Sequence, residues 1–188
     1  EAGLGFMASM FHLFTHAMFK ALLFLGAGAI IHAIHTNNLS EMGGLRKYMP
    51  ITHITFLIAC LAISGIPPFA GFFSKDEILV AAYNHHQIYF LVEWVVAGLT
   101  AFYMFRLYFG IFWGKEKEYE TTPHEAPFSM TFPLIFLAVA SAIVGFIPFS
   151  NFVTSDGFPF DIHMHWEIAL PSIGIALFGI IVAFVFYK

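Results

Sequence analysis

Two lysines lie within stretches of sequence that are otherwise apolar and uncharged. Lys20 is the only charged residue in 11–31, and Lys75 directly follows the uncharged stretch 48–74. A cation at membrane depth costs roughly 2.5–3.5 kcal/mol on insertion scales, so such a residue usually faces a polar cavity or an ion path. We therefore expect both lysines to face a hydrated interior and to carry protons or ions.

Two histidines extend the first lysine into a row. His12, His16 and Lys20 are spaced four residues apart, which places them on one face of a helix over about 12 Å. Histidine exchanges protons near neutral pH, and burial makes lysine able to do so. No third ligand accompanies the histidines, so the spacing favours proton stations over a metal site. Thr15 and His32 are secondary candidates on the same segment.

A break in the second apolar segment precedes Lys75. Two adjacent prolines remove backbone donors, and the flanking glycines allow the chain to unwind. A broken helix is tolerated in a membrane where it lines a polar cavity or packs inside protein. We therefore predict that Lys75 and its neighbour Asp76 belong to the proton pathway. The residues that predict the break are Gly65, Pro67, Pro68 and Gly71.

The third apolar segment contributes weaker candidates. Tyr103 and Arg106 lie three residues apart and are secondary candidates for the pathway. Arg106 can either pair within a helix bundle or extend to the lipid headgroups, and the sequence does not decide between these two. Glu93 lies near the other end of the segment, where we expect it at the membrane interface.

The composition predicts an all-α integral membrane protein. Of the 188 residues, 59% are hydrophobic and 11% are charged, whereas a soluble domain carries about 25% charged residues. The net charge of −4 is small, so no nucleic-acid-binding surface is expected. The single cysteine, Cys60, excludes an internal disulfide. No cluster-binding cysteines or nucleotide-binding loop are present, so we expect no cofactor in this chain.

Five membrane-spanning segments of suitable length are predicted, the second of them broken at Pro67 and Pro68. Lysine and arginine occur in the loops 36–49 and 114–128, and both are absent from the loops 84–86 and 149–165. The positive-inside rule therefore places the first two loops in the cytoplasm, and we expect a bacterial cytoplasmic membrane. Because a helical pattern already runs at Leu4, we expect an interior piece of a longer chain. The predicted segments are 4–35, 50–83, 87–113, 129–148 and 166–187.

Three motifs resemble the antiporter-like proton-pumping subunits of respiratory complex I (NADH:quinone oxidoreductase). They are FHLFTHAMFKALLFLGAG at 11–28, MGGLRKYMP at 42–50 and GIPPFAGFFSKDEIL at 65–79. The similarity is dense over 4–114, rests on hydropathy beyond 116, and is greatest to the distal subunit, called chain 5 or subunit L. The large subunit of the multi-subunit sodium/proton antiporter is the alternative, although the residues after the break favour complex I.

The resemblance implies a role for each matching residue. Lys20 is similar to the bridging lysine of a central hydrophilic axis, which His12 and His16 connect to a half-channel. Lys75 is similar to the terminal lysine through which a proton leaves, and Asp76 to its acidic neighbour. Electron transfer in other subunits, which would hold NADH, flavin, iron–sulfur clusters and quinone, would drive the transport.

The resemblance also implies an organisation and partners. Residues 1–114 would form the second half-channel, truncated at its N-terminus, 115–130 a cytoplasmic loop, and 131–188 the C-terminal transmembrane helices. The expected partners are the lipid bilayer and other membrane subunits, especially the neighbouring antiporter-like subunit. Two other hypotheses stay open. One is sodium/proton exchange with oxygen ligands from Asp76, Glu77 and Thr15, and the other is a structural scaffold.

Overall fold

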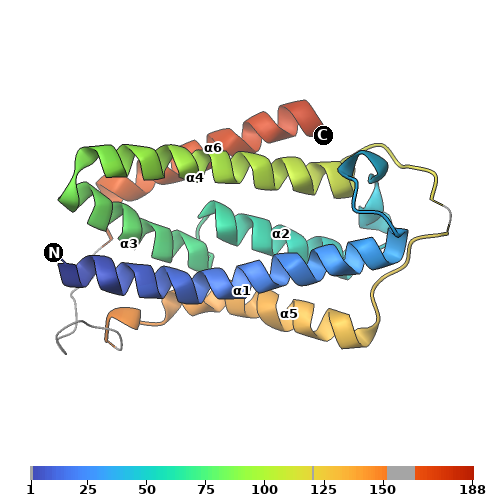
Figure 1. Ribbon diagram of the computed structural model, residues 1–188, viewed down its shortest axis with the longest axis horizontal. Helices are drawn as coiled ribbons and strands as arrows, with labels where there is room; N and C mark the ends of the chain where they lie inside the picture. Colours follow the sequence, from blue (N-terminus) through green and yellow to red (C-terminus); the bar gives the residue numbers. More distant parts are fainter. Residues whose placement is uncertain (1, 120, 152–163) are drawn as a thin grey trace.

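The helices run along one long axis and form an elongated bundle (Figure 1). A computed structural model describes residues 2–119, 121–151 and 164–188, and within these ranges it contains helices and no strand. The all-α prediction is confirmed. The α-helices of the described ranges are α1 (Ala2–Ile34), α2 (Pro50–Ser64), α3 (Ala70–His85), α4 (Gln87–Tyr108), α5 (Phe128–Ile143) and α6 (Trp166–Tyr187).

The helices account for the five predicted membrane crossings. Four stretches are long and apolar enough to span a bilayer, and they contain α1, α4, α5 and α6. With 15 residues, α2 rises only about 22 Å, which is short of the ~30 Å hydrocarbon core. α3 continues beyond its end toward the other end of the bundle, so the two together form the fifth crossing (Figure 1). The predicted break therefore separates two half-length helices.

The predicted segment ends agree with the helices to within a few residues. A π-helical turn, Phe109–Trp113, extends α4 to its predicted end. A 3₁₀ turn, Val144–Phe146, extends α5. The predicted loop 149–165 falls largely on 152–163, which lie outside the described residues.

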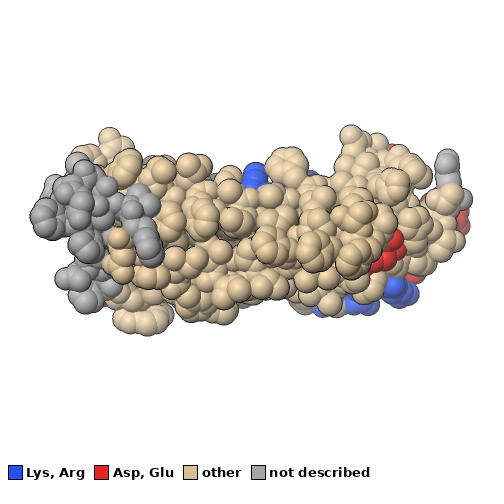
Figure 2. Space-filling view, turned by 90° about the horizontal axis from the view of Figure 1, so that it is seen from below, with Lys and Arg blue, Asp and Glu red and all other residues tan. Residues whose placement is uncertain are grey.

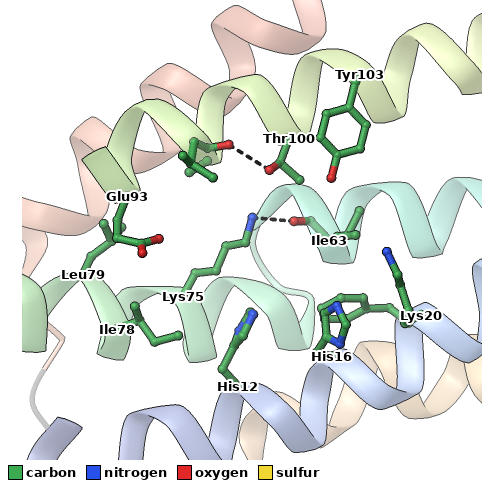
Figure 3. Close-up of a pocket in the computed structure, with 13 residues that line it drawn as sticks. His12, His16, Lys20, Ile63, Lys75, Ile78, Leu79, Glu93, Thr100 and Tyr103 are labelled. Atoms are coloured by element: carbon green, nitrogen blue, oxygen red, sulfur yellow. Dashed lines mark hydrogen bonds between the residues drawn. The ribbon is translucent and has the colours of Figure 1, made fainter. Parts of the chain in front are cut away.

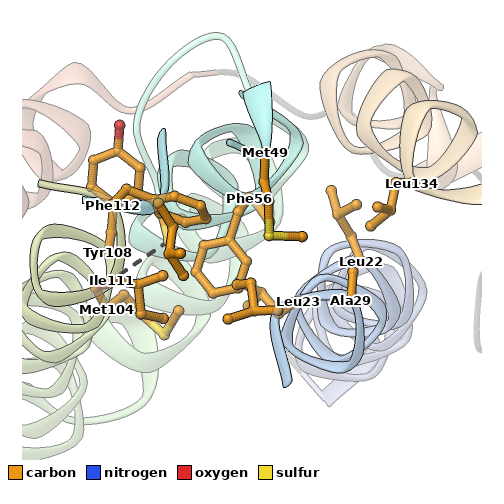
Figure 4. Close-up of a cluster of buried hydrophobic side chains, with 14 of the residues drawn as sticks. Leu22, Leu23, Ala29, Met49, Phe56, Met104, Tyr108, Ile111, Phe112 and Leu134 are labelled. Carbon is orange, nitrogen blue, oxygen red and sulfur yellow. Dashed lines mark hydrogen bonds between the residues drawn. The ribbon is translucent and has the colours of Figure 1, made fainter. Parts of the chain in front are cut away.

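The hydrophobic core joins α1, α2, α4 and α5 (Figure 4). Phe56 of α2 is fully buried at its centre, between Leu22 of α1 and Phe112. Gly26 of α1 faces Phe56, and a Cβ atom at position 26 would lie 2.9 Å from the Phe56 ring. The small residue therefore lets α1 approach α2 closely, as is common between membrane helices.

The two basic loops meet at one end of the bundle. The hydroxyl group of Tyr119 donates to the carbonyl of Gly43 at 2.7 Å and accepts from its N–H at 2.9 Å. Lys47 lies 3.4 Å from Glu116, which also accepts a hydrogen bond from Tyr48. The hydrogen bond from Tyr48 is the main cause of a lowered pKa of Glu116, and the contact with Lys47 lowers that pKa further. The predicted placement of both loops at one end is confirmed, and Figure 2 shows charged side chains gathered toward that end.

A carboxylate from the long loop caps the N-terminus of α2. Glu125 accepts hydrogen bonds from the backbone N–H groups of Ile51 (2.7 Å) and Thr52 (3.2 Å). Its other oxygen accepts from the Thr52 hydroxyl group at 2.6 Å. The first N–H groups of a helix have no partner inside the helix and therefore favour an anion. The Glu125 carboxylate supplies that anion and fixes the start of α2.

Candidate functional site

A cavity of about 220 Å³ lies between α1, α3 and α4, beside the end of α2 (Figure 3). Ionisable and hydroxyl side chains from three helices converge on it, within an otherwise apolar wall. These side chains are His12, His16 and Lys20 of α1, Lys75 of α3, and Glu93, Thr100 and Tyr103 of α4. The structure therefore brings the two sequence-predicted lysines to one common cavity.

The helix break positions Lys75. Its ammonium group donates a 2.6 Å hydrogen bond to the backbone carbonyl of Ile63, in the last turn of α2 (Figure 3). The last carbonyls of a helix lack partners inside the helix and carry the negative end of its dipole. A cation there is stabilised by about 0.3–1 kcal/mol at an exposed end and up to ~2 kcal/mol when partly buried. The break therefore supplies a polar partner to a lysine inside an apolar bundle.

Two glycines allow α2 and α3 to meet in this way. Gly65 ends α2 with φ +74°, a left-handed conformation that glycine adopts without steric cost, and a Cβ atom there would lie 3.2 Å from the Lys75 side chain. Gly71 lies inside the first turn of α3, where a Cβ atom would collide with the carbonyl oxygen of Ala62. We predicted that both glycines loosen the chain, but Gly71 instead permits close packing.

A buried hydroxyl pair connects His12 to α3. Thr15 is fully buried and donates to the Ser74 hydroxyl oxygen at 2.7 Å, and Ser74 lies 3.1 Å from Nδ1 of His12. When Ser74 donates its single proton to Nδ1, neutral His12 carries its ring proton on Nε2. The secondary candidate Thr15 therefore orients His12 through Ser74. Sequence reasoning missed Ser74, whose only signal was its place beside Lys75.

The predicted row on α1 lies along the cavity. The ring centroids of His12 and His16 are 5.8 Å apart. Lys20 follows one turn later, and its ammonium group lies 5.8 Å from the centroid of the Phe24 ring. All three side chains line the cavity, as their four-residue spacing predicted.

Glu93 adds an acidic side chain to the site. We expected Glu93 at the membrane interface; it is exposed in the second turn of α4 and lines the cavity together with Lys75 (Figure 3). Tyr103, a predicted candidate, lines the same cavity from α4, and so does Thr100, which donates to the carbonyl of Val96 at 2.8 Å. Glu93 is the one acidic side chain among the residues that line this cavity.

Three predicted residues lie apart from this cavity. His32 is exposed near the end of α1, about 18 Å along the helix from Lys20. Arg106 is exposed, and its guanidinium group lies 5.3 Å from the centroid of the Tyr187 ring at the end of α6. Asp76 is buried on another side of α3, where it lines a small neighbouring cavity with Lys75.

Relatives of known name match nearly all of this chain. It is 42% identical to NAD(P)H-quinone oxidoreductase chain 5 of Picosynechococcus, over 97% of this chain and 34% of the relative. It is 43% identical to the chloroplastic NAD(P)H-quinone oxidoreductase subunit 5 of Mesostigma viride, over 98% of this chain and 33% of the relative. The chain therefore spans about one third of the length of these relatives.

The fold and the family comparisons agree. The structure matches the Mrp complex from Dietzia with a TM-score of 0.75 over 94% of this chain and 21% of that chain. At 20% sequence identity, that likeness shows a shared fold alone. Residues 2–100 match the family model "NADH:quinone oxidoreductase/Mrp antiporter, TM", and this range contains α1, α2, α3 and the residues that line the cavity up to Thr100. The chain is an integral membrane protein and belongs to this NADH:quinone oxidoreductase/Mrp antiporter transmembrane family.

Proposed function

We propose that the chain is part of a proton-translocating membrane subunit of NAD(P)H:quinone oxidoreductase. The observation that carries this proposal is the cavity that Lys20 and Lys75 share, in a chain about 40% identical to subunit 5 of that enzyme. The proton pathway comprises His12, His16, Lys20 and Lys75, with Asp76 beside its end. Residues 1–114 form one half-channel, and other membrane subunits of the same complex are the partners.

Electrostatic repulsion between cations supplies the transfer step. Two unit charges ~10 Å apart interact by about 1–2 kcal/mol at an effective dielectric constant near 20. When Lys20 takes up a proton, its charge lowers the proton affinity of Lys75, and the reverse holds as well. Glu93, which lines the same cavity, favours the charged form of Lys75 and so opposes its deprotonation. The energy comes from electron transfer in other subunits, which carry the redox cofactors.

The test is Lys75→Ala in the assembled complex, reconstituted in closed vesicles. We expect electron transfer to continue and the number of protons pumped per electron to fall, because the residue that passes on the proton is missing. Lys117→Ala is the matched control, because Lys117 is exposed in the loop after α4. An unchanged proton-to-electron ratio in a correctly assembled Lys75→Ala complex contradicts the proposal. Sodium-dependent transport without quinone reduction would instead support the antiporter alternative.

A further inference from the structure

A second cavity, of about 470 Å³, lies between α3, α4 and α6 at the end of the bundle opposite the basic loops. The polar side chains that line this outer cavity include Tyr83, Asn84, His165 and Glu167. The indole N–H of Trp94, in its wall, is buried and has no hydrogen-bond partner among the described residues. Pro171 also lines it and, lacking an N–H, leaves the carbonyl of Glu167 without its usual helical donor. This cavity offers several groups that bind water.

A much smaller cavity, of about 10 Å³, adjoins Lys75 and Asp76. Two of its lining atoms, Oδ1 of Asp76 and Oγ of Ser64, are buried without a partner within the described ranges. Unpaired buried polar atoms destabilise the fold, and a space of roughly 10–15 Å³ holds one water molecule. This small cavity, called the inner cavity below, therefore suits a single water that bridges Ser64 and Asp76.

A layer of apolar side chains separates the two cavities. Leu79, Val80 and Ile168 are buried against one another, and Trp94 packs on them. On α3, Asp76, Val80 and Asn84 follow one another at four-residue steps of about 6 Å along one face. The face therefore passes from a buried acid, through an apolar layer, to the polar outer cavity, and α6 contributes Ile168 to the layer.

We propose that protons leave Lys75 between α3 and α6, through a gate formed by the apolar layer of Leu79, Val80 and Ile168. This inference rests on the proposed function. The Lys75 ammonium group releases its proton through the inner water to the Asp76 carboxylate. When water enters the apolar layer, the proton passes to His165 or Glu167 and on to bulk water. Hydrophobic constrictions block conduction while they are dry, so the closed layer prevents back-flow.

Val80→Thr tests the gate, because it adds one hydroxyl group at nearly constant volume. We expect an imposed proton gradient across vesicles that hold the assembled complex, without electron donor, to decay about tenfold faster, as for a barrier lowered by ~1.4 kcal/mol. The matched control is Val139→Thr, because Val139 is 52% exposed on α5 and lines neither the inner nor the outer cavity. The control should keep the gradient as the unchanged complex does.

Glu167→Gln tests the outer cavity separately. It removes a proton acceptor and leaves the apolar layer intact, so we expect slower respiration-driven pumping without passive leak. Failure of the two proposals can be told apart. Lys75→Ala without effect overturns the proposed function. The exit route alone is overturned when Lys75→Ala lowers pumping, but Val80→Thr keeps the imposed gradient and Glu167→Gln pumps normally.

Thiol labelling reports on the layer without requiring transport. Water-soluble reagents react with hydrated thiolates, and the native Cys60 is fully buried. From the side opposite the basic loops, an impermeant reagent should label Asn84→Cys rapidly and Val80→Cys at least about tenfold more slowly, since a dry thiol forms little thiolate. Equal labelling rates at the two positions would contradict a closed gate. This test remains available if the Val80→Thr complex does not assemble.

Discussion

Gly71→Ala perturbs the junction of α2 and α3 that holds Lys75. The new methyl group would collide with the backbone carbonyl of Ala62, which cannot rotate away as a side chain could. Overpacking of this kind costs about 1–3 kcal/mol. The same substitution gains up to ~1 kcal/mol of helix propensity. Because the obstacle is backbone, we expect the cost of the collision to exceed the gain in helix propensity, with a net loss of about 1–2 kcal/mol.

Relief of the collision requires α3 to move away from α2, which takes Lys75 from the carbonyl of Ile63. A hydrogen bond to a charged group contributes about 1.5–3 kcal/mol, so its loss lowers the population of the aligned lysine about tenfold or more. We therefore expect slower proton pumping at normal quinone reduction, together with a lower thermal midpoint of the assembled complex. Both are measured on the same vesicle preparation.

Gly28→Ala is the matched control, because no heavy atom lies within 4 Å of the Cβ position there. It carries the gain in helix propensity without the collision, so its stability and pumping should equal or exceed those of the unchanged protein. If Gly71→Ala behaves like Gly28→Ala in both measurements, the close approach of α2 and α3 does not position Lys75, and the reasoning fails.

Three further predictions concern a charge in the cavity and two contacts at the end of the bundle that carries the basic loops. Glu93→Gln should lower the pH at which pumping by the assembled complex is half-maximal, because Lys75 then loses a negative neighbour that favours its charged form; an unchanged pH profile would separate Glu93 from the pathway. Glu125→Ala should destabilise the start of α2 by about 1–2 kcal/mol, the usual cost of a lost N-cap, seen as faster proteolysis of the loop after α4, and normal resistance would contradict the capping role. The hydrogen bond from Tyr48 lowers the pKa of Glu116 below its usual 4.5, so this contact stabilises the folded loops above that pH and is lost as the pH falls through the lowered value. Hydrogen exchange of the two basic loops should therefore rise in acid, and the rise should be much smaller in Tyr48→Phe.

The helices and the row on α1 could be predicted from the sequence because both depend on local regularities. The length of an apolar stretch sets the number of crossings, and a four-residue spacing puts His12, His16 and Lys20 on one face whatever surrounds the helix. Adjacent prolines end a helix for a local reason as well, so the break between α2 and α3 was predictable.

The partners of Lys75 could not be predicted in the same way. Glu93 and Ser74 are separated from the α1 row by dozens of residues, and their hydropathy context pointed to an interface and to no role, respectively. Only the packing of α1, α3 and α4 shows that Glu93 lines the cavity and that Ser74 contacts Thr15. Packing also brings the His53 ring of α2 to α4, where its Nε2 lies 2.8 Å from the Tyr108 hydroxyl oxygen.

The sequence by itself determined a membrane-embedded helical protein with two lysines inside it. Charge in lipid is energetically unfavourable, so two lysines within long apolar stretches can be recognised from composition and spacing alone. Tertiary structure decided which groups stabilise the charge of these lysines. It sets the Ile63 carbonyl at the end of α2 against Lys75 and gathers both lysines around one cavity. It also places the apolar layer of Leu79, Val80 and Ile168 between the small cavity beside Asp76 and the outer cavity. These contacts join residues far apart in the chain, and close approach of backbones, as at Gly71, depends on how whole helices pack.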